Sequence, residues 1–267
     1  GYVSTQRDTK PPTGLLQDEW VGMETKTYTF SGIAKNLWLG YRKYRFTNKV
    51  SRILFLGEKK MLSDYVLGKF FNNKVDGIMV EVGAAGPNFI SQSKPFKDIG
   101  WRCICVEPNP EFAEQHRVVG NEIYEYACSY EESDDVDFEL IDFSDLSDDD
   151  LSYESYSSLG IESKISSIHG APPINKLPPI KTIKVNVRKL DSILEEASIS
   201  KFDYLIVDVE GWELEVMDGF NSSQYQPKVI VLENLGDPSE QHDYMSNIGY
   251  RYDSFDRTDG PNYIYVR

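Results

Sequence analysis

The sequence has few cysteines and no long apolar run. No run approaches the roughly 20 residues of a membrane-spanning helix, and the first residues lack the charged-then-apolar pattern of a secretion signal, so we expect a soluble protein. The three cysteines, Cys103, Cys105 and Cys128, lie in apolar segments without the spacing of a metal site. We therefore expect buried free thiols, which favour a reducing compartment such as the cytoplasm.

Positive charge is scarce in the larger part of the chain. The net charge of −15 divides into +6 for residues 1–80, with 13 Lys and Arg against 7 Asp and Glu, and −21 for residues 81–267, with 15 against 36. Because nucleic-acid binding depends on clustered cations, we expect no nucleic-acid partner for residues 81–267. The ordinary interpretation of the acidic excess is solubility.

The 267 residues, 40% of them hydrophobic, suffice for one large domain with an appendage. We predict that residues 1–60 form the appendage and that residues 61–267 form the main domain. The appendage consists of a polar arm followed by a segment of interleaved aromatic and cationic residues. The interleaved segment is interpreted either as a helix packed on the main domain or as a binding site for phosphates or an oligosaccharide. Gly1 in place of Met indicates a tag remnant or a domain of a larger polypeptide, and the oligomeric state is not predicted.

Strands and helices alternate from residue 77 onward. The predicted strands cover residues 77–83, 102–107, 122–129, 202–211 and 228–236, and the predicted helices cover residues 59–72, 88–100, 111–119, 187–198 and 212–220. Residues 250–267 form two alternating runs around Asp259-Gly260, which is typical of an antiparallel hairpin. This order predicts an α/β fold with a doubly wound, mostly parallel sheet and an antiparallel edge.

The segment VEVGAAGPNF, residues 80–89, places the carboxylate of Glu81 just before a glycine loop. Ligands of open α/β sheets bind beyond the carboxyl ends of the strands, where a following acid receives ribose hydroxyls. Glu107 follows Gly83 by 24 residues, close to the expected interval of about 20, so we expect a ligand with a ribose. The loop lacks the G-x-G-x-x-G run that binds a pyrophosphate, which favours a nucleoside without one.

The segments VEVGAAGPNF, CICVEPNPEF, ACS, KLDSILEE and DYLIVDVEGWELEVMDGF together resemble the FkbM-type S-adenosylmethionine-dependent methyltransferases, from about Asp76 to Leu235. The resemblance implies a seven-stranded class I methyltransferase (Rossmann-like) fold and a hydroxyl acceptor on a sugar or a secondary metabolite. It also implies a cofactor site made by Glu81, Gly83, Ala84 and Gly86 at the amino-acid end, Glu107 at the ribose, and Ala127 and Cys128 beside the adenine.

Glu81 has two interpretations. The sulfonium and ammonium of S-adenosylmethionine are cationic, so an acidic pocket mouth suits this cofactor. The family more often has Asp at this position, so Glu81 departs from the family pattern. The alternative is a structural residue whose carboxylate pairs with a Lys or with backbone amides, because a buried carboxylate without a partner costs free energy.

A sugar hydroxyl is a weak nucleophile at neutral pH, so its methylation needs a general base or a metal. Asp208 and Glu210 end one predicted strand and are the candidate catalytic residues, and Glu233 and Asn234 end the next strand. Because neighbouring parallel strands end at the same edge, Asp208, Glu233 and Asn234 are candidate ligands of Mg²⁺ or Mn²⁺, in a pattern that resembles metal-dependent O-methyltransferases. The alternative is that Asp208 orients the substrate and Glu210 caps a helix beginning at Trp212.

Three histidines are further candidate bases. His116 falls in a predicted surface helix and is expected to be inert, whereas His169 and His242 fall in predicted loops.

Residues 131–154, with 12 acidic and no basic side chains, begin an irregular segment that extends to Pro179. This segment is interpreted as a lid, a substrate loop or a solvated insertion, and its charge argues against a polyanionic acceptor.

We therefore predict an S-adenosylmethionine-dependent O-methyltransferase that acts on a sugar or glycan hydroxyl, with or without a metal ion. One alternative is O-methylation of a small secondary metabolite. A second is a nucleotide-dependent oxidoreductase, against which the missing third glycine of the loop argues. A catalytically inactive binding module would be expected to lack Asp208 and Glu210, which are both present.

Overall fold

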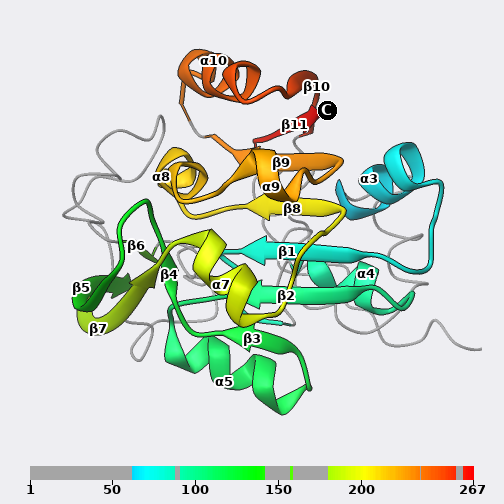
Figure 1. Ribbon diagram of the computed structural model, residues 1–267. Helices are drawn as coiled ribbons and strands as arrows, with labels where there is room; N and C mark the ends of the chain where they lie inside the picture. Colours follow the sequence, from blue (N-terminus) through cyan, green and yellow to red (C-terminus); the bar gives the residue numbers. More distant parts are fainter. Residues whose placement is uncertain (1–61, 88–90, 142–156, 159–179, 235, 257–260) are drawn as a thin grey trace, which may run out of the picture. The chain divides into compact units, whose positions relative to one another are not determined.

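Seven strands form the main sheet, in the order β10-β11-β9-β8-β1-β2-β3 (Figure 1). The structure is a computed structural model that describes residues 62–87, 91–141, 157–158, 180–234, 236–256 and 261–267. The strands of this sheet are β1 (Ile78–Val82), β2 (Arg102–Val106), β3 (Glu122–Tyr124), β8 (Tyr204–Val207), β9 (Val229–Glu233), β10 (Arg251–Asp256) and β11 (Asn262–Val266).

The direction of the strands agrees with the predicted fold. Strands β9, β8, β1, β2 and β3 are parallel, whereas β11 pairs antiparallel with β9 and β10 pairs antiparallel with β11. The predicted mostly parallel sheet with a C-terminal antiparallel hairpin is confirmed. Its predicted turn at Asp259-Gly260 and the predicted appendage of residues 1–60 lie outside the described residues.

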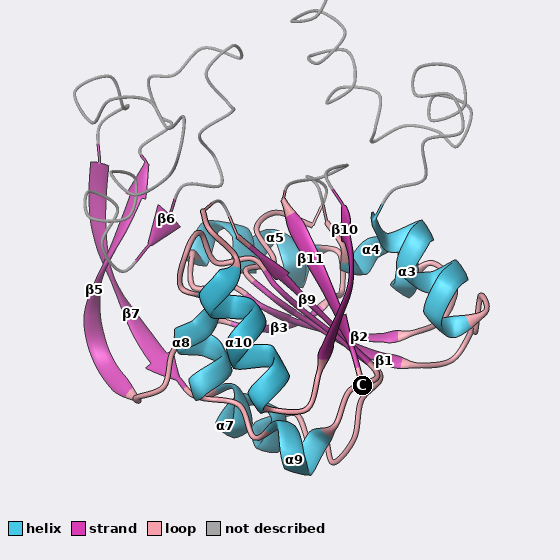
Figure 2. Ribbon diagram, turned by 90° about the horizontal axis from the view of Figure 1, so that it is seen from above, coloured by secondary structure: helices cyan, strands magenta, loops and turns pink. Residues whose placement is uncertain are grey.

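Helices cover both faces of the sheet. Figure 2 shows α3 and α4 on one side and α7, α8, α9 and α10 on the other. The helices within the described residues are α3 (Leu62–Phe71), α4 (Ser93–Lys97), α5 (Pro110–Val118), α7 (Leu190–Glu196), α8 (Glu213–Asp218), α9 (Ser222–Tyr225) and α10 (Ser239–Asn247). Because both faces are covered, the central strands β8 (YLIV) and β9 (VIVLE) are nearly continuous apolar runs, and every residue in them is buried.

A second, four-stranded sheet has the order β4-β7-β5-β6. It consists of β4 (Ala127–Cys128), β5 (Ser133–Ile141), β6 (Ser157–Ser158) and β7 (Ile180–Arg188), and it has a small apolar cluster of its own. The single strand predicted over residues 122–129 is therefore divided between two sheets, as β3 and β4.

The prediction of an irregular acidic segment is wrong for its first part, because β5 pairs antiparallel with β7. Acidic side chains of the first part meet cations from β7: Asp134 pairs with Arg188 at 2.7 Å, and Asp137 pairs with Lys184 at 2.6 Å. These cations lie about fifty residues away in sequence, so the acidic run on its own did not reveal the pairing. Most of the remainder, residues 142–156 and 159–179, lies outside the described residues.

Two further expectations concern the apolar composition. Cys103, Cys105 and Cys128 are buried free thiols, as predicted. Burial raises the pKa of Cys103 and of Cys128 to about 12. Within the part of the chain that the structure describes, no helix combines the length and apolarity needed to cross a membrane.

Candidate active site

The glycine loop after β1 is fixed between the ends of three strands. Gly83 has a φ of +82°, and a Cβ added there would lie 1.8 Å from the backbone oxygen of Asp208, so glycine alone fits. The backbone N–H groups of Gly83 and Ala84 donate to the Val106 carbonyl at 3.0 and 3.1 Å, and the N–H of Asp208 donates to the Val82 carbonyl at 3.0 Å. The loop therefore lies at the carboxyl edge of the sheet, where ligands of open α/β sheets bind.

Glu81 is buried at the end of β1, and its carboxylate binds the start of α4. Oε1 accepts from the N–H of Gln92 at 2.8 Å, and Oε2 accepts from the N–H of Ser93 at 3.1 Å. Burial raises the pKa of Glu81 to about 7, against these bonds, which favour its charged form. These bonds correspond to the structural interpretation of Glu81, with backbone amides as partners, and a contact with the cofactor stays a prediction.

Glu107 directly follows β2 and binds the glycine loop. Its Oε2 accepts from the N–H of Ala85 at 2.8 Å, and its Oε1 accepts from the N–H of Asn109 at 2.8 Å. Burial raises the pKa of Glu107 to about 7. Each carboxylate oxygen has a second lone pair, so both can still accept from ribose hydroxyls. The ribose role of Glu107 stays a prediction, and the remaining acceptor capacity of its two oxygens fits that role.

The other predicted cofactor residues surround this loop or follow β3. Ala84 is buried beside Gly83, and a Cβ added at Gly86 would lie 3.3 Å from Oε1 of Gln115 in α5. Ala127 and Cys128 are buried in β4, which pairs parallel with the end of β7. Their place beside an adenine stays a prediction.

Three carboxylates meet where β8 and β9 end. Asp208, Glu210 and Glu233 each offer an oxygen, and these oxygens lie within 4.8 Å of one another. Val207 pairs with Leu232 in the parallel register of β8 and β9, so the residues that follow them, Asp208 and Glu233, are neighbours. This group, called the acidic cluster below, brings together both predicted catalytic residues and two of the three predicted metal ligands.

Glu233 is the most buried member of the acidic cluster. Its Oε2 is buried and has no hydrogen-bond partner among the described residues. Its pKa is raised well above the ordinary value, first by burial and then by the negative charges of Asp208 and Glu210. A carboxyl in this position needs a proton or a cation, and three carboxylate oxygens are the ligand chemistry that a hard divalent cation prefers.

A tight turn brings Glu210 back to the acidic cluster. Glu210 and Gly211 have φ values of +56° and +92°, so two successive residues adopt the left-handed conformation. Oε1 of Glu213 accepts from the N–H groups of Val209 at 3.1 Å and Gly211 at 3.0 Å and so stabilises this turn. α8 begins at Glu213, one residue after the predicted start at Trp212, and the interpretation of Glu210 as a helix cap stays a prediction.

Asn234, the third predicted metal ligand, forms bonds of its own. Its Oδ1 accepts from the N–H of Gly236 at 2.7 Å, and its Nδ2 donates to Oε1 of Gln241 at 3.1 Å. Metal coordination by Oδ1 would have to share or replace the bond to Gly236. Asn234 as a ligand stays a prediction, and Glu210 joins Asp208 and Glu233 in the group that the structure brings together.

The two histidines that the structure describes, His116 and His242, each differ from the prediction in one respect. His116 is in α5 but is fully buried, so its predicted surface position is wrong. His242 is in α10 rather than in a loop, and its Nδ1 is hydrogen-bonded to the Tyr265 hydroxyl at 2.9 Å. His169 lies outside the described residues. The one sequence signal for the burial of His116 is its position three residues after Ala113, the other buried residue of α5.

Comparisons with known proteins bear on this site. Residues 81–252 match the model of the family described as the methyltransferase FkbM domain, a range that includes the glycine loop, Glu107 and the acidic cluster. The curated proteins give no significant match. Among solved structures, the chain is similar to 1,6-didemethyltoxoflavin-N1-methyltransferase of Burkholderia thailandensis, solved with 1,6-didemethyltoxoflavin and S-adenosylhomocysteine. That similarity has a TM-score of 0.33 and 9% identity over 91% of each chain, too low to indicate a substrate.

Proposed function

The chain belongs to the FkbM family of S-adenosylmethionine-dependent methyltransferases, and from this premise we propose that it methylates a hydroxyl group of a sugar or glycan. A small secondary metabolite with a hydroxyl group is the alternative acceptor. The observation that carries the proposal is the acidic cluster beside the glycine loop. A hydroxyl must lose a proton to accept a methyl group, and a set of carboxylates at this position suits that requirement.

The residues of the loop region suit S-adenosylmethionine. The carboxylate of Glu107 retains a lone pair on each oxygen for the two ribose hydroxyls, and the neighbouring acidic cluster attracts a cationic sulfonium. When bound, S-adenosylmethionine supplies an already activated methyl group. The work left to the protein is therefore alignment, exclusion of water and proton transfer.

In this proposal Asp208 is the catalytic residue that accepts the proton of the acceptor hydroxyl. The new bond joins the acceptor oxygen to the methyl carbon, the carbon–sulfur bond breaks, and the hydroxyl proton passes to the carboxylate. Glu210, also half-buried, orients the acceptor by accepting a hydrogen bond from a second hydroxyl. The raised pKa of Glu233 favours a proton on Glu233 in the absence of a metal, which leaves Asp208 as the charged carboxylate that accepts the proton of the acceptor.

A metal-assisted form of the reaction uses the same side chains. Asp208 and Glu233, with Glu210 or Asn234 as a third oxygen ligand, would hold Mg²⁺ or Mn²⁺. When bound, the cation would lower the pKa of the acceptor hydroxyl, so that proton loss would no longer depend on a strong protein base. The buried oxygen of Glu233 that has no partner among the described residues supports this form.

The acceptor is tested by incubating the protein with methyl-labelled S-adenosylmethionine and panels of sugars, glycans and small hydroxylated metabolites. We expect label on a sugar or glycan hydroxyl. Label confined to the small metabolites would favour the alternative acceptor, and label on nitrogen would exclude O-methylation. Calorimetry with S-adenosylhomocysteine and with NAD tests the cofactor separately, and binding of NAD alone would favour the oxidoreductase.

The metal is tested with the acceptor found in that screen. Exhaustive dialysis against EDTA should abolish transfer, Mg²⁺ or Mn²⁺ should restore it, and S-adenosylhomocysteine should bind equally well throughout. The variant Glu233→Gln should need a higher metal concentration for half-maximal rate, because one anionic ligand is lost with little change in shape. Full turnover in EDTA would exclude the cation and leave Asp208 as the base.

A further inference from the structure

His116 contacts the glycine loop from the buried side of α5. Its side chain is fully buried, and its Nε2 lies 2.9 Å from the carbonyl oxygen of Ala85. Its Nδ1 lies 2.8 Å from Nδ2 of Asn121, the residue that follows the turn after α5. The N–H of Asn121 also donates to the His116 carbonyl at 2.9 Å, which holds the two residues together.

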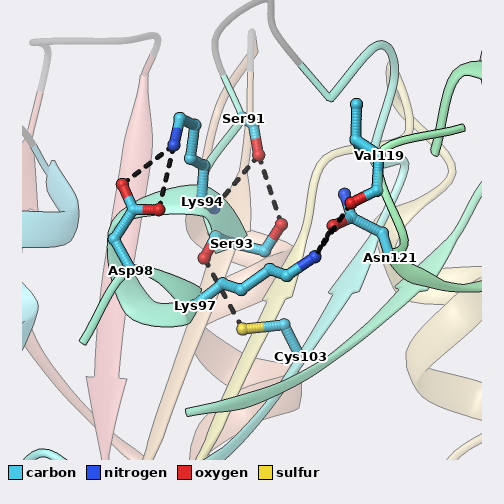
Figure 3. A network of polar contacts seen from close by, with 8 residues as sticks. All are labelled: Ser91, Ser93, Lys94, Lys97, Asp98, Cys103, Val119 and Asn121. Atoms are coloured by element: carbon cyan, nitrogen blue, oxygen red, sulfur yellow. Dashed lines mark hydrogen bonds and ion pairs between the residues drawn. The ribbon is translucent and has the colours of Figure 1, made fainter. Parts of the chain in front are cut away.

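Lys97 at the end of α4 fixes which way these groups point. Its Nζ donates to Oδ1 of Asn121 and to the Val119 carbonyl at 3.4 Å (Figure 3). It also donates to the Gly120 carbonyl at 3.0 Å. Because an ammonium can only donate, the oxygen of the Asn121 amide faces Lys97 and the Nδ2 group faces His116. Nδ1 of His116 must therefore accept, and the ring hydrogen lies on Nε2, which donates to Ala85.

Ala85 is held from both sides by buried side chains. Its φ is +44°, in the left-handed region that costs a non-glycine residue roughly 1 kcal/mol. Its N–H donates to Glu107, and its carbonyl accepts from His116. Both polar backbone groups of Ala85 are thus bound, so these two contacts hold the middle of the loop, between Gly83 and Gly86, in a conformation that the backbone would not favour by itself.

We propose that His116 is a positioning residue for the cofactor: through its Nε2–H it holds the Ala85 carbonyl and, together with Glu107, it sets the glycine loop in the shape that receives S-adenosylmethionine. This inference rests on the proposed function, because it assumes that this loop binds the cofactor. His116 lies behind the loop and acts on the cofactor through Ala85. Its loss should therefore weaken cofactor binding and leave the rate at saturating cofactor nearly unchanged.

The test compares two substitutions by calorimetry with S-adenosylhomocysteine. His116→Leu removes the donor to Ala85 and should weaken binding roughly tenfold, because a buried carbonyl is left unpaired. His116→Gln keeps an amide N–H near the position of Nε2–H and should bind within about threefold of the unchanged protein. In turnover measurements His116→Leu should raise the KM for S-adenosylmethionine by a similar factor while kcat stays nearly constant.

A matched control separates positioning from general stability. Tyr250→Phe removes another buried side-chain bond, from the Tyr250 hydroxyl to the Pro227 carbonyl at 2.7 Å, which has no contact with the loop. It should lower the melting temperature and leave the affinity for S-adenosylhomocysteine unchanged. Equal affinity in His116→Leu and the unchanged protein would overturn the inference. If Tyr250→Phe weakened binding as much as His116→Leu, the effect would be one of stability, and the inference would also fail.

Two further outcomes keep the test decisive. If His116→Leu does not fold, Asn121→Leu takes its place, because it keeps His116 but removes the group that fixes its hydrogen on Nε2. This variant should weaken binding by a smaller factor, and unchanged affinity would overturn the inference. Failure of the unchanged protein to bind S-adenosylhomocysteine would instead overturn the proposed cofactor, and with it the function.

Discussion

The carboxylates at the ends of β1 and β2 differ from those at the ends of β8 and β9 in what faces them. Glu81 and Glu107 are each 4% exposed, and each binds two backbone amides, those of Gln92, Ser93, Ala85 and Asn109. Glu233 is 7% exposed, and it faces the carboxylates of Asp208 and Glu210. Similar burial therefore occurs in two settings: the first pair binds the backbone of the loop region, whereas Glu233 faces other carboxylates, and our proposal assigns the acidic cluster to proton transfer or to a cation.

The largest expected difference between these two regions is in turnover. Asp208→Asn should lower kcat by about 10²–10⁴, the usual contribution of a general base, because an amide does not accept the hydroxyl proton. The variant should fold normally and bind S-adenosylhomocysteine as the unchanged protein does, since the contact with Gly83 involves the backbone of Asp208. Radiolabel transfer and calorimetry measure the two effects. Turnover near that of the unchanged protein would make Asp208 a structural residue.

The second expected difference is in stability, and matched substitutions reveal it. Glu81→Leu leaves the buried amides of Gln92 and Ser93 unpaired and should lower the free energy of unfolding by at least about 2 kcal/mol. Glu233→Leu replaces a buried carboxyl that faces the carboxylates of Asp208 and Glu210 with an apolar side chain, and should leave that free energy unchanged or higher. Denaturant unfolding at pH 8 measures both. Equal losses of stability in the two variants would contradict the difference between the carboxylates at the ends of β1 and β2 and those of the acidic cluster.

The sheet and its loop were largely predictable from the sequence, and the partners of the buried acids were not. Strands such as VIVLE are apolar throughout, and the glycine loop, the strand-end acid and the hairpin follow local patterns. The carboxyl ends of parallel strands meet at one edge, which is why Asp208 and Glu233 were predicted to be close together. That inference needed only the strand order and no knowledge of side-chain directions.

The remaining features depend on contacts between distant residues. The pairing of β5 with β7 joins an acidic run to cations far along the chain, so local composition suggested an irregular segment. The burial of His116 results from packing against the loop at Ala85, 31 residues earlier in the chain. Glu213 binds the amides of Val209 and Gly211 across the left-handed turn at Glu210 and Gly211, a contact that depends on the geometry of the turn and not on sequence spacing alone.

Glu107 combines the two roles, because it binds backbone amides and is also predicted to bind a ligand. Glu107→Ala should weaken S-adenosylhomocysteine binding by roughly 1.5–3 kcal/mol, the value of a charge-assisted pair of ribose hydrogen bonds. Calorimetry measures the loss, and circular dichroism checks that the variant is folded. Unchanged affinity would remove the ribose role and leave Glu107 as a holder of the loop, equivalent to Glu81.

The smallest expected effect is a pH dependence of cofactor binding. Burial raises the pKa of Glu107 to about 7, and the charged form is the better acceptor for ribose hydroxyls. Affinity for S-adenosylhomocysteine should therefore be constant above about pH 8 and fall by up to about tenfold by pH 6. Titration calorimetry across this range measures the slope, which Glu107→Gln should remove.

Stability should follow the opposite direction over the same range of pH, which makes this the sharpest form of the comparison. The pKa of Glu107 is about 7 in the folded protein and 4.5 for an ordinary glutamate, so between these values the folded state binds more protons than the unfolded state. This contribution to the free energy of unfolding is complete below about pH 4.5 and is lost as the pH rises through 7. Burial raises the pKa of Glu81 and Glu213 to about 7 as well, so Glu107→Gln should keep most of the slope in stability while losing the slope in affinity. If the pH slopes of stability and of affinity both vanished in Glu107→Gln, both would depend on the protonation of Glu107 alone. Carboxylates that order the backbone could then not be distinguished from carboxylates that bind ligands.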